Sequence, residues 1–328
     1  MPRLNRLHSI GHRVLVTGSR GKSSVVRLLH AAFHSAGIEA WARITGVEPR
    51  ELGPSGERLI DRSAGAHVEE MRWWLQRVPR SAGAVVLENS AVTPDFQGLA
   101  GQWLGPGLTV LTSVVPDHQE AWGPDAASAA QVLCGGIPGG GAVVAPLALQ
   151  NDGYLLGLLR QRRCRVVFAE PSPGEGNDAV SLNRGLAIEA ARQCGLPENE
   201  SREAFEKLAP DRFDFRVVKR GGAQVALAFS ANDPDSTRAA FESLGWRPSE
   251  TRLVYNHRKD RPERYRAFSS WLRSGHWREV MVVGDRPPGL KAPGYFGMRA
   301  GEGLGDLLRP GDRVFGCGNI AGLPLELY

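Results

Sequence analysis

One stretch near the start of the chain, residues 13–33 (RVLVTGSRGKSSVVRLLHAAF), restricts the possible folds more than any other. The apolar run 14–16 has strand character, and it leads through Gly18 and Gly21 into a segment whose apolar residues recur at helical spacing. Glycines in such a turn let backbone N–H groups approach phosphate oxygens, and the N-terminus of the following helix favours negative charge. The order of strand, glycine loop and helix therefore predicts an α/β domain that binds a nucleotide.

The predicted nucleotide contacts are the residues of this loop: Gly18, Ser19, Arg20, Gly21, Lys22, Ser23 and Ser24. The ammonium of Lys22 can reach β- and γ-phosphates, and the hydroxyl of Ser23 can ligate Mg²⁺. The loop is shorter than the full GxxxxGK[ST] pattern and has Val16 at an early position. A glycine turn with a chance lysine is the alternative interpretation. The strand before the loop and the helix after it favour phosphate binding.

Short apolar runs alternate with helical stretches along the 328 residues, which predicts βαβ units, a mostly parallel sheet and two domains. The first series has expected strands at 13–17, 83–88, 108–113, 141–145 and 165–169 and expected helices at 22–36, 65–78, 125–134, 151–162, 178–195 and 199–208. After a break near 209–216, the second series has strands at 224–230, 251–256, 279–284 and 312–319 and helices at 233–245 and 262–274. We therefore expect one α/β domain over 1–212 and another over 213–328.

The net charge of +5 raises the question of nucleic-acid binding, but the basic residues are nearly all arginines and are scattered along the chain. Arginine suits fork-shaped recognition of phosphate and carboxylate groups, so we expect small anionic substrates and no nucleic acid. The cysteines (Cys134, Cys164, Cys194 and Cys317) lack metal-ligand spacing, which is typical of reduced thiols in a cytosolic protein. The sequence predicts neither a transmembrane helix nor a signal peptide.

Polar side chains end two of the expected strands. Glu88 closes the strand in VVLENSA, and the next strand is followed by Asp117, His118 and Glu120 in LTSVVPDHQEAWG. Each group taken alone is typical of a solvated turn. Because the carboxyl ends of parallel strands meet at one edge of a sheet, the two groups together favour a metal and phosphate site.

These blocks, TGSRGKSS, LENSAVTPDFQ and LTSVVPDHQEAWG, together resemble the Mur ligase superfamily of ATP-dependent amide ligases. In the second half, FSANDPDSTRAAF, YNHRKDRPERYRAF and VFGCGNIAGLPLELY are similar to the ligase subunit of capsular poly-γ-glutamate synthetases of the CapB/PgsB type. The blocks run from residue 14 to the C-terminus in the same order. The resemblance implies a Mur-ligase-like P-loop domain followed by a Rossmann-like α/β domain, with ATP and Mg²⁺ as cofactors.

The resemblance also implies roles for individual residues. Lys22, Glu88 and His118 would be catalytic, with Ser23, Glu88 and His118 as metal ligands. Asn183 in SLNRGLAIEAA would lie against adenine, and Arg212 in PDRFDFR would reach the nucleotide from the junction of the domains. Asn232 and Asp233 take the substrate-binding place of the HNP motif of Mur ligases.

Several departures from the family bear on the substrate. The loop begins too early for the UDP-binding domain of Mur ligases, so a UDP-sugar peptide is not expected. The sequence has no lysine between Lys22 and Lys207 to supply the carbamylated lysine of many members. Phe229 stands where a ribose-binding Asp is common. Residues 25–87 and 119–180 are short for a polymerising enzyme, so single ligation and polymerisation both stay open.

The resemblance therefore implies a cytoplasmic ATP-dependent carboxylate–amine ligase that acts through an acyl phosphate on an acidic amino acid, such as glutamate, or on a small peptide. Arg258 and Arg261, with Arg264, are candidate carboxylate clamps, and a solvated basic helix start is the alternative. A poly-γ-glutamate synthase would need a membrane subunit as partner, and a homo-oligomer stays open. The alternative functions are a P-loop NTPase that drives a switch or transport, and a nucleotide-binding partner without activity.

Overall fold

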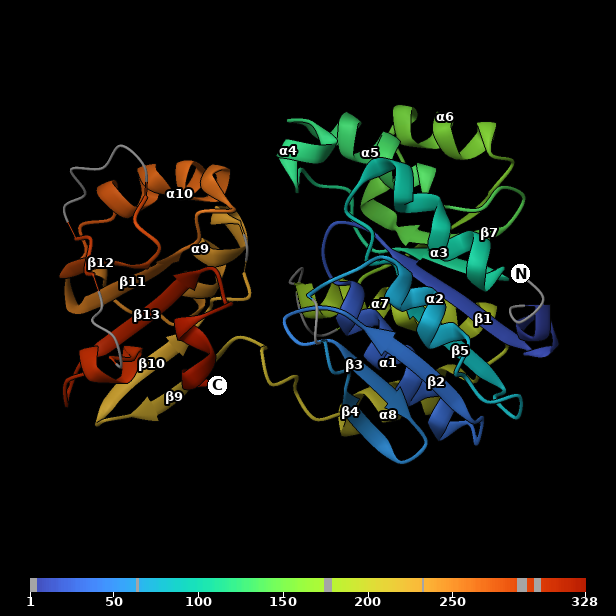
Figure 1. The fold of residues 1–328 in the computed structure, drawn as a ribbon, viewed down its shortest axis with the longest axis horizontal. Coiled ribbons are helices and arrows are strands. Elements are labelled where there is room, and N and C mark those ends of the chain that lie inside the picture. Colours follow the sequence, from blue (N-terminus) through green and yellow to red (C-terminus); the bar gives the residue numbers. More distant parts are fainter. Residues whose placement is uncertain (1–4, 63–64, 174–178, 232, 288–293, 298–301) are drawn as a thin grey trace. The chain divides into compact units, whose positions relative to one another are not determined.

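The computed structural model describes residues 5–62, 65–173, 179–231, 233–287, 294–297 and 302–328. The chain divides into two compact units, Met1–Ala209 and Pro210–Tyr328 (Figure 1). Each unit is an α/β structure built on its own sheet. No helix in the described ranges is both long and apolar enough to cross a membrane.

The first unit is built on an eight-stranded sheet in the order β4-β3-β2-β5-β1-β6-β7-β8. Its strands are β1 (His12–Thr17), β2 (Ala40–Ile44), β3 (Arg50–Gly53), β4 (Gly56–Leu59), β5 (Ala84–Glu88), β6 (Leu108–Leu111), β7 (Ala142–Pro146) and β8 (Arg165–Ala169). Six neighbouring strands pair in parallel, in the order β2, β5, β1, β6, β7 and β8. The hairpin of β3 and β4 adds two antiparallel strands at one edge. The expected mostly parallel sheet is confirmed.

Helices cover both faces of this sheet, because alternate residues of its central strands are buried on opposite sides. The helices are α1 (Lys22–Ser35), α2 (Glu69–Leu75), α3 (Gln97–Leu104), α4 (Gln119–Trp122), α5 (Ala126–Gly135), α6 (Gly153–Gln161), α7 (Ala179–Gln193) and α8 (Glu198–Lys207). Val14 and Val16 of β1 pack with α1, α7 and α8, whereas Leu15 and Leu87 pack with α2 and α3.

The second unit has a five-stranded sheet in the order β12-β11-β13-β10-β9. Its strands are β9 (Arg216–Arg220), β10 (Ala223–Leu227), β11 (Thr251–His257), β12 (Glu279–Gly284) and β13 (Arg313–Gly318), and its helices are α9 (Pro234–Ser243) and α10 (Pro262–Ser274). Four strands are parallel and β9 is an antiparallel edge strand. The α/β class expected for this half is confirmed as well.

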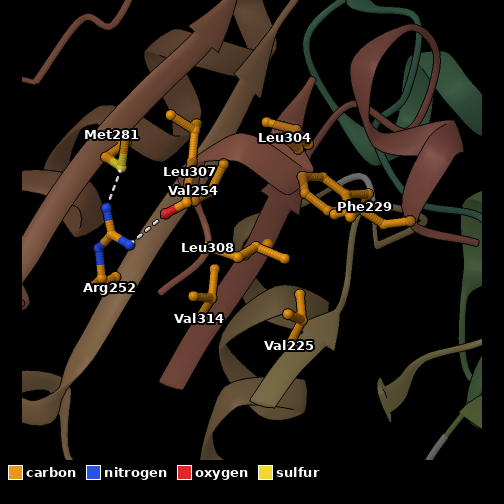
Figure 2. Close-up of a pocket in the computed structure, with 11 residues that line it drawn as sticks. Val225, Phe229, Arg252, Val254, Met281, Leu304, Leu307, Leu308 and Val314 are labelled. Atoms are coloured by element: carbon orange, nitrogen blue, oxygen red, sulfur yellow. Dashed lines mark hydrogen bonds between the residues drawn. The ribbon is translucent and has the colours of Figure 1, made fainter. Parts of the chain in front are cut away.

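The two faces of the second sheet are covered differently. An aromatic cluster that includes Phe241, Trp271 and Phe315 packs α9 and α10 on one face. On the other face, the short 3₁₀ segments Leu304–Leu307 and Leu323–Leu327 enclose a small apolar pocket (Figure 2). The buried Arg252 closes its side, where Nη1 donates to the Leu307 carbonyl at 2.6 Å and Nη2 contacts Met281 Sδ at 3.2 Å. The apolar lining shows a packed core with one ion-paired arginine.

Several elements were not expected from the sequence. Strand β2, the hairpin of β3 and β4, helices α3 and α4, and strand β9 are all additions to the expected series. The hairpin has charged residues on both strands, and β4 is exposed along its whole length. An exposed edge strand needs no apolar alternation, so it leaves no periodic signal in the sequence.

Candidate functional site

The predicted phosphate loop lies between the end of β1 at Thr17 and the start of α1 at Lys22. Gly18 and Gly21 both have positive φ, at 131° and 81°. A Cβ at Gly18 would overlap with Thr112 Oγ1, and a Cβ at Gly21 would overlap with Asn183 Oδ1. Both positions therefore require glycine for backbone conformation and for space.

The segment that follows β6 holds this loop in place. Ser19 N donates to the Ser113 carbonyl at 3.0 Å, and Ser19 Oγ donates to the Val115 carbonyl at 2.8 Å. Arg20 N donates to Ser113 Oγ at 2.8 Å. Ser19 is only 5% exposed, so its hydroxyl serves the loop itself. The loop is thus fixed before any ligand binds, which suits a rigid anion cradle.

Lys22 folds back over the loop. Its Nζ donates to the carbonyl of Gly18 at 2.6 Å and to that of Ser19 at 3.3 Å. Burial lowers the pKa of Lys22, while the charges of Glu88 and Asp117 oppose that shift. The ammonium is therefore a partly desolvated cation at the mouth of the loop, where an anionic group gains most from it. Ser24 is the third residue of the same helix and is half-buried.

Glu88 and Ser23 are in direct contact. Ser23 Oγ donates to Glu88 Oε2 at 2.8 Å, and Glu88 is only 3% exposed. Thr45 completes the arrangement, since its hydroxyl donates to Oε1 at 2.9 Å and its backbone N–H donates to Oε2 at 3.2 Å. Sequence reasoning missed Thr45, which directly follows the unexpected strand β2. Two elements far apart in the sequence thus orient one carboxylate toward the loop.

His118 and Asp117 lie beyond β6, as their place in the sequence predicts. Asp117 Oδ1 accepts from His118 N at 2.9 Å and lies 3.6 Å from Arg20 Nη2. Burial raises the pKa of Asp117, but the charges of Arg20 and His118 and the bond from His118 N outweigh burial, so the pKa is lowered overall. His118 Nδ1 lies 3.7 Å from Glu120 Oε1. His118 itself adopts a left-handed conformation with φ 46°.

The donor set of the loop fits a nucleotide with a hard divalent cation. Ser23 and Glu88 offer oxygen ligands, and Mg²⁺ typically takes one or two protein oxygens and the phosphates of its nucleotide. The backbone cradle around Gly18 and Gly21 leaves no room for side chains there. Among the residues that the structure describes, no three His, Cys, Asp or Glu side chains converge as a metal cage. An all-protein cage of that kind is unusual for Mg²⁺.

The remaining nucleotide contacts expected from the sequence lie in different places. Asn183 on α7 contacts the phosphate loop, because its side chain packs against Gly21. Arg212 lies at the start of the second unit, where its guanidinium is 5.4 Å from the centre of the Phe213 ring.

The expected substrate residues all belong to the second unit. Asp233 caps α9, since its Oδ1 accepts from Ser236 N at 2.8 Å, and Asn232 lies outside the described residues. Arg258 pairs with Asp260 through two bonds of 2.9 and 2.6 Å. Arg261 is the N-cap residue of α10. Asp233 thus has a structural task that the sequence did not reveal.

Near the carboxyl ends of the second sheet, Arg264, a predicted carboxylate clamp, bonds to a pair of asparagines that the sequence did not single out. Asn256 on β11 and Asn319 after β13 exchange bonds, with Asn256 Nδ2 donating to the Asn319 carbonyl at 2.5 Å and Asn319 Nδ2 donating to the Asn256 carbonyl at 2.9 Å. Arg264 Nη1 donates to Asn319 Oδ1 at 2.5 Å. Arg264 therefore helps to hold the ends of β11 and β13 in register with α10.

Comparison with protein families and known proteins supports the resemblance seen in the sequence. Residues 213–328 match the family model of the poly-gamma-glutamate synthase CapB C-terminal domain. The chain is 25% identical over 283 residues to the capsule biosynthesis protein CapB of Bacillus anthracis, a match that covers 80% of this chain and 61% of the relative. It is 24% identical over 277 residues to the PGA synthase CapB of Bacillus subtilis, covering 79% of this chain and 70% of the relative. The matched part thus spans about three fifths of the first relative.

Solved structures share the fold across nearly the whole chain. A bifunctional folylpolyglutamate synthase/dihydrofolate synthase with Mn, AMPPNP and L-glutamate bound has a TM-score of 0.72 at 15% identity, covering 99% of this chain and 91% of the other. E. coli FolC in complex with ADP has a TM-score of 0.70 at 17% identity, covering 99% and 90%. The expected resemblance is confirmed: this chain is similar to the CapB proteins, its residues 213–328 match the CapB C-terminal domain family, and its fold is that of the folylpolyglutamate synthases.

Proposed function

We propose that this protein is an ATP-dependent carboxylate–amine ligase that forms ADP and phosphate and acts on glutamate or a short acidic peptide. The observation that carries the proposal is the contact between Ser23 and Glu88 beside Lys22 at a rigid phosphate loop. The relatives named as CapB and the folylpolyglutamate synthase fold support the same class of reaction. Residues 1–212 are the proposed ATP-binding domain and residues 213–328 the proposed ligase domain.

The reaction needs activation because a carboxylate is a poor electrophile. Transfer of the γ-phosphoryl group of ATP to the substrate carboxylate gives an acyl phosphate and ADP. The amine then attacks the acyl carbon, phosphate leaves, and the amine proton passes to solvent or to a base. The backbone N–H groups of 18–24 and the ammonium of Lys22 would hold the phosphates and offset their charge.

The proposed metal contacts are Ser23 and Glu88, and His118 is a proposed metal contact of lesser importance. Mg²⁺ supplies charge neutralisation on the β- and γ-phosphates when bound. Glu88 would hold its carboxylate in one orientation because Thr45 and Ser23 donate to both oxygens. Asn183 and Arg212 are proposed to contact the nucleoside part of ATP. The side chain of Asn183 lies beside Gly21 of the loop.

The second unit is proposed to bind the amine substrate. Arg258 and Arg261 would hold a carboxylate on that substrate, with Asp233 and Asn232 beside it. Arg258 would have to exchange its present partner Asp260 for the ligand, since both bonds of that pair use its guanidinium. Polymerisation would call for a membrane subunit as partner of a cytoplasmic protein, and a single ligation would not.

The test is a screen of acidic amino acids and γ-glutamyl peptides as carboxylate and as amine, with phosphate release and product mass as readouts. We expect ATP turnover only when both substrates are present, with ADP and phosphate as products. AMP and pyrophosphate would overturn the acyl-phosphate route. Turnover that needs neither substrate but responds to a protein partner would favour an NTPase that drives a switch or transport.

A further inference from the structure

Arg43 lies near the carboxyl end of β2, the strand that precedes Thr45. In the sheet it pairs with Leu87 of β5, the residue before Glu88. Two residues later, Thr45 donates to both oxygens of Glu88. Paired residues of parallel strands point to the same side of a sheet, so Arg43 faces the α2 side along with Leu87. It therefore lies beside the metal and phosphate site, on the face opposite to α1.

The guanidinium of Arg43 is buried with most of its donors unused. The residue is 0% exposed, and Nη2 donates to Glu70 Oε2 at 2.7 Å. Nε and Nη1 have no hydrogen-bond partner in the part of the chain that the structure describes. Burial lowers the pKa of Arg43, and the charges of Glu70 and Glu88 oppose that shift. Because a guanidinium stays charged in proteins, its unused donors carry a large desolvation cost until an acceptor meets them.

Arg43 shares the carboxylate of Glu70 with a second arginine. Arg62 Nε donates to the same oxygen of Glu70 at 2.9 Å, and Arg62 Nη2 lies 2.8 Å from that oxygen. The other oxygen of Glu70 accepts from His67 N at 3.0 Å, so both arginines meet this carboxylate at the same oxygen. Two guanidinium groups thus share a single carboxylate.

The cross-strand neighbour of Arg43 is an acidic residue that bonds to other groups. Glu51 lies opposite Arg43 on β3. Its Oε1 accepts from Arg58 Nη2 at 2.6 Å, and its Oε2 accepts from Trp74 Nε1 at 2.6 Å. Glu51 is therefore engaged with other groups, so Nε and Nη1 of Arg43 remain the donors that an incoming carboxylate could meet.

We propose that Arg43 and Arg62 form a binding site for a carboxylate of the acyl substrate, separate from the carboxylate that is activated. This inference rests on the proposed ligase function and specifies its substrate: the acyl substrate is a dicarboxylate, such as the terminal glutamyl unit of an acidic chain. Arg62 is the member closer to solvent, with its side chain 22% exposed, and meets the ligand first. The charge of Arg43 stabilises the bound carboxylate from inside.

The nucleotide is not the ligand of this pair. The phosphate loop lies at the start of α1, whose buried residues pack on the other face of the sheet with Val14 and Val16. A dicarboxylate held at Arg43 and Arg62 would instead approach Glu88 from the α2 side.

The experiment measures binding directly by calorimetry, with the full chain, Mg²⁺ and a non-hydrolysable ATP analogue. The probes are glutarate and butyrate, which differ by one carboxylate. We expect the wild type to bind glutarate more tightly than butyrate. Arg62→Gln and Arg43→Lys should each weaken glutarate binding about 10- to 100-fold, the range for a hydrogen bond to a charged group. Neither variant should change the affinity for the nucleotide analogue.

Arg58→Gln is the matched control, because Arg58 belongs to the same cluster but pairs with Glu51 and has a side chain 76% exposed. It should leave glutarate affinity within about twofold. An equal loss in Arg58→Gln, or equal binding of glutarate and butyrate by the wild type, would overturn the proposal. If circular dichroism shows that Arg43→Lys does not fold, Arg62→Gln alone tests the proposal, because the side chain of Arg62 is only half-buried.

The outcomes separate this inference from the proposed function. If the wild type forms no amide bond from any substrate pair but loses glutarate binding in Arg62→Gln, the carboxylate site stands and the ligase function fails. If the wild type is a ligase and both variants keep their glutarate affinity and the KM for the acyl substrate, the function stands and the carboxylate site is refuted.

Discussion

The two units place their candidate residues in different ways. In the first unit, the carboxylate of Glu88 is buried and receives bonds from Ser23 and Thr45, and the phosphate loop is tied to the segment after β6. In the second unit, Arg258 is bonded to Asp260, and both side chains are substantially exposed at 39% and 52%. The first site is therefore organised before a ligand arrives. Under the proposed function, the second site would have to exchange a surface ion pair for its substrate, which would cost affinity but allow the ligand to be released.

The largest effect is expected at the phosphate loop of the first unit. Lys22→Ala should lower ligation about 100- to 1000-fold, because it removes the cation that offsets charge on the transferring phosphoryl group. The melting temperature should change little, since Nζ only bonds loop carbonyls. Phosphate release under saturating substrates is the measurement. Lys207→Ala, at a side chain 77% exposed, is the control. Comparable turnover in Lys22→Ala would remove the loop from the mechanism.

Glu88→Gln tests the carboxylate of the same site while preserving its shape. The amide can still accept from Ser23 and Thr45 through its carbonyl oxygen, so the fold should persist. Loss of the negative charge should weaken the metal dependence of turnover about 10- to 100-fold in a Mg²⁺ titration. Glu120→Gln, at a side chain 55% exposed, should leave the titration unchanged. Identical titrations for Glu88→Gln and the wild type would place the metal elsewhere.

Gly21→Ala tests whether the loop is rigid. Its φ of 81° and the overlap of a new Cβ with Asn183 both oppose the substitution. We expect a loss of about 1–3 kcal/mol in the free energy of unfolding and about tenfold weaker nucleotide binding. The double variant Gly21→Ala with Asn183→Ala removes the overlap and should recover part of the stability. If the double variant is no more stable than the single one, the contact with Asn183 does not constrain the loop.

The smallest effect is expected at the ion pair of Arg258 and Asp260. Asp260→Asn removes the competitor of the substrate carboxylate at Arg258, so the KM for the amine substrate should fall by about two- to fivefold, as for an exposed ion pair. Arg258→Ala should raise the same KM, and neither change should affect the KM for ATP. A fall in KM for both ATP and the amine substrate in Asp260→Asn would contradict a local exchange and weaken the contrast between the units.

The parts of the site that the sequence predicted are those with local signals. Lys22 and Ser23 follow from the order of strand, glycine loop and helix, and Glu88 follows from its place at the end of an apolar run. Thr45 and Arg43 could not be found in this way. Their strand, AWARI, contains a charged residue, and what makes them important is contact with Glu88 and Glu70. A bond between residues separated by 43 positions has no periodic trace in the chain.

The sequence by itself determined the α/β class, the alternation of strands and helices and the place of the phosphate loop, because hydrophobic periodicity and glycine positions act over a few residues. Only the tertiary structure decided which strands are neighbours. It brought β2 beside β5, and so Thr45 to Glu88 and Arg43 to the edge of the site. The physical reason is that buried charges and hydrogen-bond donors must find partners wherever the packed chain brings them, at any separation in sequence.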